Sequence, residues 1–220
     1  VRSVDPHHLV SLGELGDLEE AVGDLAGQAD TLERTLAVLD DEGLRVPIAR
    51  RLAGLYEDEL GQPERAIDAL GAWSEADLAD PEPLRRLVPL LRAASRWPAL
   101  LATYDALVDI EDDDLAVSEA VRAGADVAFR QLGDVDGAWD RLVPRVTLGD
   151  AAAEAQLRAL AEDAGRGGQL ADYYAELAGQ GAEPVRQSGR WMDAAEARER
   201  LAGDPAGALE AVLKAFALDL

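Results

Sequence analysis

The sequence contains no cysteine, only two histidines and a single lysine, and its aromatic residues make up 5% of the chain. The absence of cysteine excludes disulfide bonds, zinc–thiolate sites and cysteine nucleophiles. His7 and His8 are adjacent, so they would point in different directions on a helix, and the sequence places no third ligand beside them. No segment approaches the ~18 consecutive apolar residues that span a bilayer. We therefore expect no metal, no other cofactor and no membrane insertion.

The charge is strongly acidic, because 44 Asp and Glu residues outnumber 21 Lys and Arg residues and give a net charge of −23. A field of that sign repels nucleic acid and anionic membrane surfaces. It favours a protein partner that is basic or peptide-like, and it also keeps a chain soluble without any partner. We expect no nucleic-acid binding. The charge alone does not decide between a basic or peptide-like protein partner and a role in solubility only.

Ala and Leu are abundant, and their arrangement is repetitive. Three segments have Gly first, Ala sixth and an apolar residue tenth, and they begin at about 70-residue intervals: GQPERAIDAL from Gly61, GDVDGAWDRL from Gly133 and GDPAGALEAV from Gly203. A second type alternates with them: GDLEEAVGDL from Gly16, SRWPALLATY from Ser95 and GRGGQLADYY from Gly165. Gly ends one helix, and the Asp or Pro that follows begins the next. Each segment therefore predicts the turn and second helix of a helical hairpin.

The first helices of these hairpins agree with one another as well. Eight residues before each glycine of the first type stands another alanine: Ala53, Ala125 and Ala195. Small residues at matched positions of both helices indicate close antiparallel packing, in which little side chain fits between the two backbones.

The segment LAGLYEDELGQPERAIDAL resembles a tetratricopeptide repeat. Ala53, Tyr56, Gly61 and Ala66 fall near the small, aromatic, turn-glycine and alanine positions of that family. The segment LAGDPAGALEAVLKAFALDL is similar. The resemblance implies an all-α fold, an α-solenoid of stacked antiparallel helical hairpins forming a TPR-like superhelix. It also implies a concave surface, lined by the first helices, that binds a partner protein.

We expect about six hairpins in one domain, residues 1–220, which could be a fragment of a longer array. Two stretches, 30–43 and 179–190, read as irregular or linker-like. The predicted helices are 6–14, 17–29, 31–40, 44–60, 63–77, 83–94, 98–108, 115–132, 135–146, 151–164, 168–179, 187–202 and 205–218.

Two motifs suggest chemistry only superficially. The acidic run from Glu111 to Asp114 lacks the glycine and the spaced oxygens of a calcium loop, so we interpret it as a cap for the following helix. The glycines of GRGGQ, residues 165–169, follow a helix and lack the Gly-Lys-Ser/Thr of a phosphate loop, which indicates an inter-helix turn. With both histidines at the amino terminus, no catalytic triad can be built. We expect no catalytic residues and no enzyme activity.

We therefore predict a non-catalytic scaffold or adaptor that binds a partner protein through its helical-repeat surface. Candidate contacts are the arginines of the first helices and one of two adjacent tyrosines: Arg50, Arg51, Arg85, Arg86, Arg122, Arg130 and Tyr174. The alternative is a structural subunit that assembles end to end into a filament or a larger complex, forming a homo-oligomer through its uncapped ends. We expect the four tryptophans in the core and the protein in the cytoplasm.

Overall fold

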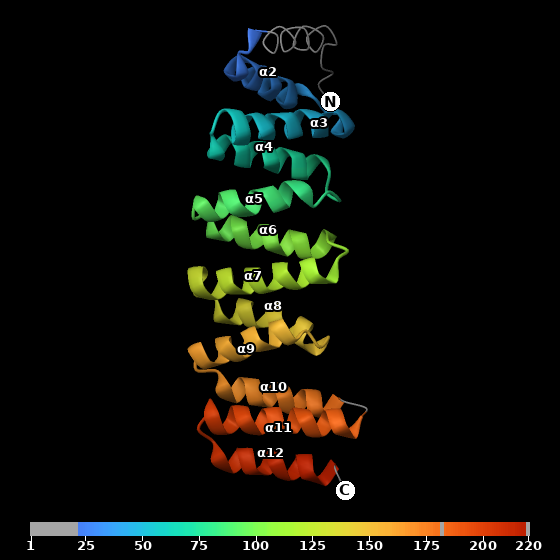
Figure 1. The fold of residues 1–220 in the computed structure, drawn as a ribbon, viewed down its shortest axis with the longest axis vertical. Coiled ribbons are helices and arrows are strands. Elements are labelled where there is room, and N and C mark those ends of the chain that lie inside the picture. The colour runs from blue at the N-terminus through green and yellow to red at the C-terminus, as the bar shows by residue number, and fades with distance from the viewer. Residues whose placement is uncertain (1–21, 181–182, 219–220) are drawn as a thin grey trace. The chain divides into compact units, whose positions relative to one another are not determined.

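The computed structural model describes residues 22–180 and 183–218, and every regular element within those ranges is helical (Figure 1). The predicted helix 6–14, the start of the predicted helix 17–29, and His7 and His8 lie outside the described residues. The elements are α2 (Leu25–Val38), α3 (Glu42–Gly54), the π-helical turn η1 (Leu55–Glu59), α4 (Pro63–Ala76), α5 (Glu82–Ala93), α6 (Trp97–Ile110), α7 (Asp114–Leu132), α8 (Val135–Thr147), α9 (Ala151–Asp163), α10 (Gly167–Gln180), α11 (Pro184–Arg200) and α12 (Pro205–Leu218).

The chain forms two compact units, Val1–Ala120 (unit 1) and Val121–Leu220 (unit 2), where the sequence predicted one domain. The boundary between them falls within α7. Inside each unit, helices pack against their neighbours in the sequence, and consecutive helices run antiparallel (Figure 1). This series is α2 to α6 in unit 1 and α8 to α12 in unit 2. Serial packing of antiparallel hairpins confirms the all-α, TPR-like solenoid fold within each unit.

The predicted turns at Gly61, Gly133, Gly165 and Gly203 form, whereas the segment from Gly16 lies largely outside the described residues. Gly133 ends α7 with a φ of +70°, a left-handed conformation that glycine adopts without a steric penalty. Asp134 then begins α8, because its side chain accepts a 2.8 Å hydrogen bond from the backbone N–H of Gly137. Asp204 begins α12 in the same way, through a 2.9 Å bond from Gly207. The Gly-Asp pairs of the sequence are thus the stop and start signals of successive helices.

The matched alanines lie where the helices approach most closely. Ala53 and Ala66 are fully buried in unit 1, as are Ala125 and Ala138 in unit 2. Among the tryptophans, Trp73 and Trp139 are buried as expected, whereas Trp97 and Trp191 are half-exposed. The core therefore lies in seams between neighbouring helices, built mainly from alanine and leucine with a few large rings.

Three boundary predictions differ from the structure. Residues 30–38 continue α2, which runs unbroken to Val38, so most of the predicted irregular stretch 30–43 is helical. Most of 179–190 is helical too, because α11 begins at Pro184, a residue that fits the first turn of a helix. The predicted helix 44–60 is an α-helix followed by the wider π turn η1.

The two motifs are structural. In the acidic run, Asp113 accepts a 3.3 Å hydrogen bond from the backbone N–H of Leu115 at the start of α7, which is a helix-capping contact. Gly167, in the GRGGQ segment, begins α10 after a short turn. A β-carbon there would lie 2.4 Å from the carbonyl carbon of Leu201, so this glycine permits close contact between α10 and the end of α11.

Candidate protein-binding surface

The four candidate arginines of unit 1 all pair with other side chains of the chain. Arg85 on α5 donates two hydrogen bonds, 2.8 and 2.7 Å long, to Glu111, whose side chain is only 7% exposed. Such a fork holds both groups in a fixed geometry. Arg51 on α3 donates to Glu59 and to Gln28, both at 3.3 Å.

Arg50 and Arg86 belong to a cluster around Trp73. The Arg50 guanidinium lies 4.5 Å from the centre of the indole ring and that of Arg86 lies 5.7 Å away, within the range of cation–π attraction. Arg50 also pairs with Asp80 at 3.6 Å, and Arg86 pairs with Glu57 of η1. These two arginines therefore cover a buried ring.

In unit 2, Arg130 pairs with Asp126 one turn earlier on α7, at 2.7 Å. Arg122 is half-buried, and its backbone carbonyl accepts a 2.8 Å hydrogen bond from the side chain of Gln156 on α9. Tyr174 is fully buried, which contradicts its expected role as an exposed contact. The half-buried neighbour Tyr173 packs edge-on against Trp139 with ring centres 6.4 Å apart, and its hydroxyl donates a 3.2 Å bond to the carbonyl of Val143.

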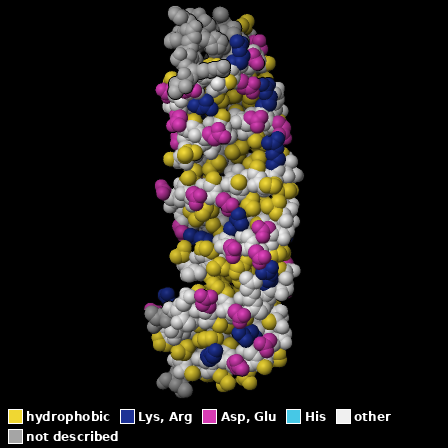
Figure 2. Space-filling view, turned by 180° about the vertical axis from the view of Figure 1, so that it is seen from behind, with side chains coloured by type: hydrophobic (Ala, Val, Ile, Leu, Met, Phe, Trp, Pro, Cys, Tyr) yellow, Lys and Arg dark blue, Asp and Glu magenta, His cyan; other side chains and the backbone are white. Residues whose placement is uncertain are grey.

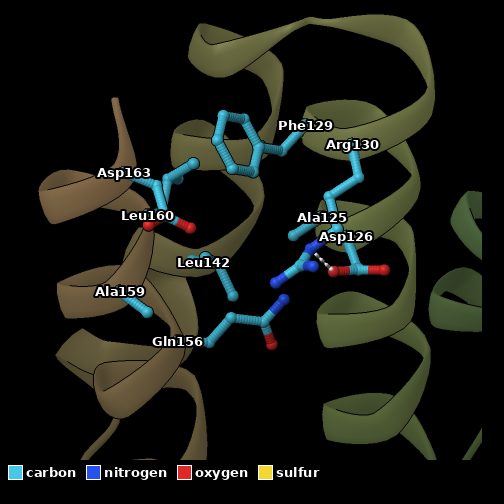
Figure 3. Close-up of a pocket in the computed structure, with 10 residues that line it drawn as sticks. Ala125, Asp126, Phe129, Arg130, Leu142, Gln156, Ala159, Leu160 and Asp163 are labelled. Carbon is cyan, nitrogen blue, oxygen red and sulfur yellow. Dashed lines mark ion pairs between the residues drawn. The ribbon is translucent and has the colours of Figure 1, made fainter. Parts of the chain in front are cut away.

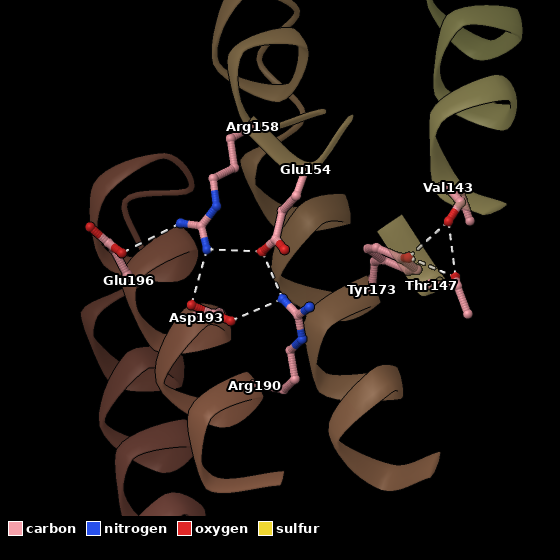
Figure 4. Close-up of polar contacts among 8 residues, drawn as sticks. All are labelled: Val143, Thr147, Glu154, Arg158, Tyr173, Arg190, Asp193 and Glu196. Atoms are coloured by element: carbon pink, nitrogen blue, oxygen red, sulfur yellow. Dashed lines mark hydrogen bonds and ion pairs between the residues drawn. The ribbon is translucent and has the colours of Figure 1, made fainter. Parts of the chain in front are cut away.

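A network of two arginines and two acids joins α9 to α11 (Figure 4), and both arginines lie over the buried ring of Tyr174. The guanidinium groups of Arg158 and Arg190 lie 4.9 and 5.5 Å from its ring centre. Glu154 accepts hydrogen bonds from Arg158 at 3.3 Å and from Arg190 at 2.7 Å. Asp193 also accepts from both, at 3.0 and 3.1 Å. The two acids and two arginines thus form a closed ring of charge-assisted hydrogen bonds.

This network alters the acidity of its members. Burial alone would raise the pKa of Glu154, but the hydrogen bonds and positive charges of Arg190 and Arg158 outweigh it, so the pKa is lowered. Burial and the nearby Glu154 carboxylate raise the pKa of Tyr174. Its hydroxyl makes no well-formed hydrogen bond to any described residue, although Glu154 lies beside it. Because the pKa of Glu154 is lowered and that of Tyr174 is raised, Glu154 is ionised and Tyr174 is neutral at neutral pH.

Two hollows lie along α9, one on each side, and we call them together the α9 groove. The smaller hollow, of about 30 Å³, opens between α7 and α9 and holds no more than about one water molecule. Figure 3 shows the Arg130–Asp126 pair and Gln156 facing this space. The larger hollow, of about 450 Å³, lies between α9 and α11. Ala159, an exposed residue of α9, lines both.

The charges of the α9 groove are unevenly balanced. Its three arginines all pair with carboxylates of the chain: Arg130 with Asp126, Arg158 with Glu154, Asp193 and Glu196, and Arg200 with Glu196. Glu162 and Asp163, at the carboxyl end of α9, are exposed and form no ion pair with any described residue. The groove therefore presents two uncompensated negative charges beside a small apolar floor.

Of the residues that line this groove, the sequence analysis proposed only Arg130 as a partner contact. Glu162 and Asp163 lie at the end of α9, in the segment AEDAGR. Acidic residues just before a turn are common in so acidic a chain, so the sequence does not single these two out. Arg158 on α9 and Arg190 on α11 are 32 positions apart. This separation is close to the distance in sequence between adjacent first helices, so it could have indicated that the two arginines lie side by side.

The part of the chain that the structure describes contains no group of three or more His, Cys, Asp or Glu side chains suited to a metal ion. Within the same residues, no helix combines the length and apolar character needed to cross a bilayer.

Comparisons with known proteins give structural similarities only. No family model matches the chain, and no curated protein sequence does. Two crystal structures of MamA are each 15% identical to it, with TM-scores of 0.39, and cover 93% and 96% of this chain and 94% and 91% of their own. A tetratricopeptide repeat protein from Parabacteroides merdae ATCC 43184 is 14% identical, with a TM-score of 0.39, and covers 98% of this chain and 87% of its own. The TPR-like description of this chain rests on its own hairpins.

Proposed function

We propose that the chain is a non-catalytic scaffold that binds a basic segment of a partner protein in the α9 groove. The observation that carries the proposal is the charge balance of that groove. Every arginine lining it is engaged by carboxylates of the chain, while Glu162 and Asp163 are free. An acidic partner would have to break existing ion pairs, whereas a basic partner gains new ones.

The groove also fits an elongated ligand better than a small molecule. Its larger hollow is open and lies between parallel first helices α9 and α11, with Leu170 and Ala197 beneath and Glu162, Glu196 and Arg200 around it. Grooves between helices bind helical or extended segments through a few apolar anchors and a polar rim. A segment with small apolar residues and Lys or Arg at the flanks matches both features.

A fluorescein-labelled 12-residue peptide of alternating Lys and Leu pairs is a suitable probe, with a Glu–Leu peptide of the same length as its counterpart. We expect the basic peptide to bind with an affinity that falls as salt is raised, since exposed charges are screened. The double variant Glu162→Gln/Asp163→Asn should weaken binding about tenfold, because it removes both free charges. Fluorescence anisotropy measures both effects.

The matched control is Asp68→Asn/Glu75→Gln, which neutralises two exposed carboxylates on α4 in unit 1 and changes the net charge equally. This control should bind the basic peptide within about twofold of the wild type. Equal losses of affinity in the two variants would mean that overall charge alone attracts the peptide. Tighter binding of the Glu–Leu peptide than of the Lys–Leu peptide would contradict the proposal, because the groove would then prefer an acidic ligand.

A further inference from the structure

Four arginines recur at one position of successive first helices, 36 residues apart in the sequence: Arg50 on α3, Arg86 on α5, Arg122 on α7 and Arg158 on α9. We call them the arginine series. On the surface seen in Figure 2, basic side chains lie among acidic ones. Three members of the series accordingly form ion pairs, Arg50 and Arg86 in unit 1 and Arg158 in unit 2.

Arg122 has no such partner. It is half-buried, and its side chain forms no ion pair, hydrogen bond or aromatic ring contact with any residue that the structure describes. Its Nε atom is buried without an acceptor in the same part of the chain. A half-buried charge that lacks a partner loses hydration without compensation, so it costs stability unless a carboxylate is supplied.

The sequence explains this difference. Each carboxylate that serves another arginine of the series has a neutral residue at the corresponding position around Arg122: Ser118 corresponds to Glu154, Leu157 to Asp193, Leu160 to Glu196, Ala152 to Asp80 and Ala93 to Glu57. Two acids near Arg122 on α7 do not replace them. Asp126 is paired with Arg130 at 2.7 Å, and the exposed Glu119 forms no ion pair with any described residue. Arg122 is therefore available to a carboxylate from outside the chain.

Arg122 lies beside the α9 groove. It stands three residues before Ala125 and four before Asp126, which line the smaller hollow, so the three residues share one face of α7. Its backbone carbonyl accepts the 2.8 Å hydrogen bond from the side chain of Gln156, a residue of α9 that lines the same hollow. Arg122 and the groove are thus held together by a contact between α7 and α9.

The α9 groove consequently has ends of opposite charge. Arg122 lies beside Gln156, whereas the free acids Glu162 and Asp163 lie at the carboxyl end of α9. Gln156 and Asp163 are seven positions apart on this helix, which is about 10 Å at a rise of 1.5 Å per residue. An extended segment covers that distance with about three residues. One short segment can therefore reach both ends.

We propose that Arg122 receives the carboxylate of an acidic side chain of the partner, so that the α9 groove selects a segment with Glu or Asp near one end and Lys or Arg near the other. This inference rests on the proposed function and adds a direction to it. Guanidinium and carboxylate groups form paired, charge-assisted hydrogen bonds. The reversed segment would place its acid beside Glu162 and Asp163 and its cations beside Arg122, and both contacts repel.

Two labelled peptides with blocked ends, LLKKLLKKLLEE and LLKKLLKKLLQQ, test the proposal by fluorescence anisotropy. The wild type should bind the Glu peptide about fivefold more tightly than the Gln peptide. The net charge of −23 on its own favours the Gln peptide, so the expected preference has the opposite sign to a general charge effect. Arg122→Gln should abolish the preference. The matched control Arg34→Gln, at an exposed arginine of α2, removes the same charge and should keep the preference within about twofold.

Urea unfolding separates a binding role of Arg122 from a structural one. Arg122→Gln should leave the urea midpoint unchanged or raise it, because the side chain has no partner among the described residues. Arg158→Gln should lower the midpoint, because it removes ion pairs with three carboxylates. A marked fall of the midpoint in Arg122→Gln would assign this arginine a structural role and overturn the proposal.

The peptide outcomes distinguish this inference from the proposed function. Failure of the wild type to bind the Gln peptide at all would contradict the proposed function itself. Binding of the Gln peptide without any preference for the Glu peptide would overturn the inference alone, as would a preference that survives in Arg122→Gln. A third peptide, LLKKLLKKLLQQ with a free terminal carboxylate, should bind no more tightly than its blocked form. Binding equal to that of the Glu peptide would mean that Arg122 takes a chain terminus instead of a side chain.

Discussion

Trp73 in unit 1 and Tyr174 in unit 2 occupy comparable environments that are built differently. Each is a buried ring on a second helix, and each lies within cation–π distance of two arginines from the neighbouring first helices. Around Trp73 the arginines have separate partners, Asp80 and Glu57. Around Tyr174 they share both partners, Glu154 and Asp193.

The comparison shows how a chain poor in aromatics closes seams between alanine-rich helices. A guanidinium group has apolar faces that cover a ring and charged edges that reach carboxylates at the surface. In unit 1 the two arginines have separate carboxylate partners, so their ion pairs contribute to stability independently. Shared partners make the unit 2 cluster cooperative, because the loss of one carboxylate leaves two arginines less well paired.

The largest effect should follow removal of either ring. Trp73→Ala and Tyr174→Ala should each lower the free energy of unfolding by about 3–5 kcal/mol, because a large cavity forms between closely packed helices. Urea unfolding followed by circular dichroism measures the loss. Tyr174→Phe is the control and should stay within about 1 kcal/mol of the wild type, since the hydroxyl makes no well-formed hydrogen bond. A loss below 1 kcal/mol for either alanine variant would show that its ring does not anchor the seam.

A smaller loss of stability should distinguish the cluster around Trp73 from the network around Tyr174. Glu154→Gln should destabilise the protein by about 1–3 kcal/mol, since it leaves both Arg158 and Arg190 with one carboxylate partner fewer. Glu57→Gln removes the carboxylate partner of Arg86 alone and should lower stability by about 1 kcal/mol or less. Urea midpoints of the two variants, with equal transition slopes, give the comparison directly. Equal losses would mean that sharing of partners adds nothing to the unit 2 network.

The sequence predicted the hairpins well because their signals are local. Gly133 and Asp134 act within one turn, and Ala125 and Ala138 occupy neighbouring helices whose spacing is fixed by the repeat. In the stretch 30–43 the predicted helix 31–40 is largely confirmed, but it is part of one helix with the residues before it: no glycine or proline lies between Asp30 and Val38, and Ala29 and Leu36 are buried on the same helix.

The candidate site was less predictable, because it depends on which charges are already paired. Arg85 is exposed and lies on a first helix as expected, yet Glu111 engages it from 26 positions away. Tyr174 and Tyr173 are adjacent and chemically alike, and only the register of α10 decides that Tyr174 is the buried one. Pairing and register are properties of tertiary contacts, which one sequence does not specify.

The smallest effect is the pH dependence that Glu154 contributes in unit 2. The pKa of Glu154 is lower in the folded protein than its ordinary value of 4.5, so its stabilising contribution is complete above that value and is lost as the pH falls through the lowered pKa. The stability difference between the wild type and Glu154→Gln should therefore shrink as urea midpoints are measured from neutral pH down to about pH 3. The difference between the wild type and Trp73→Ala arises from packing and should stay constant over the same range. A Glu154→Gln difference that persists unchanged in acid would show that the carboxyl acts by its shape rather than by its charge.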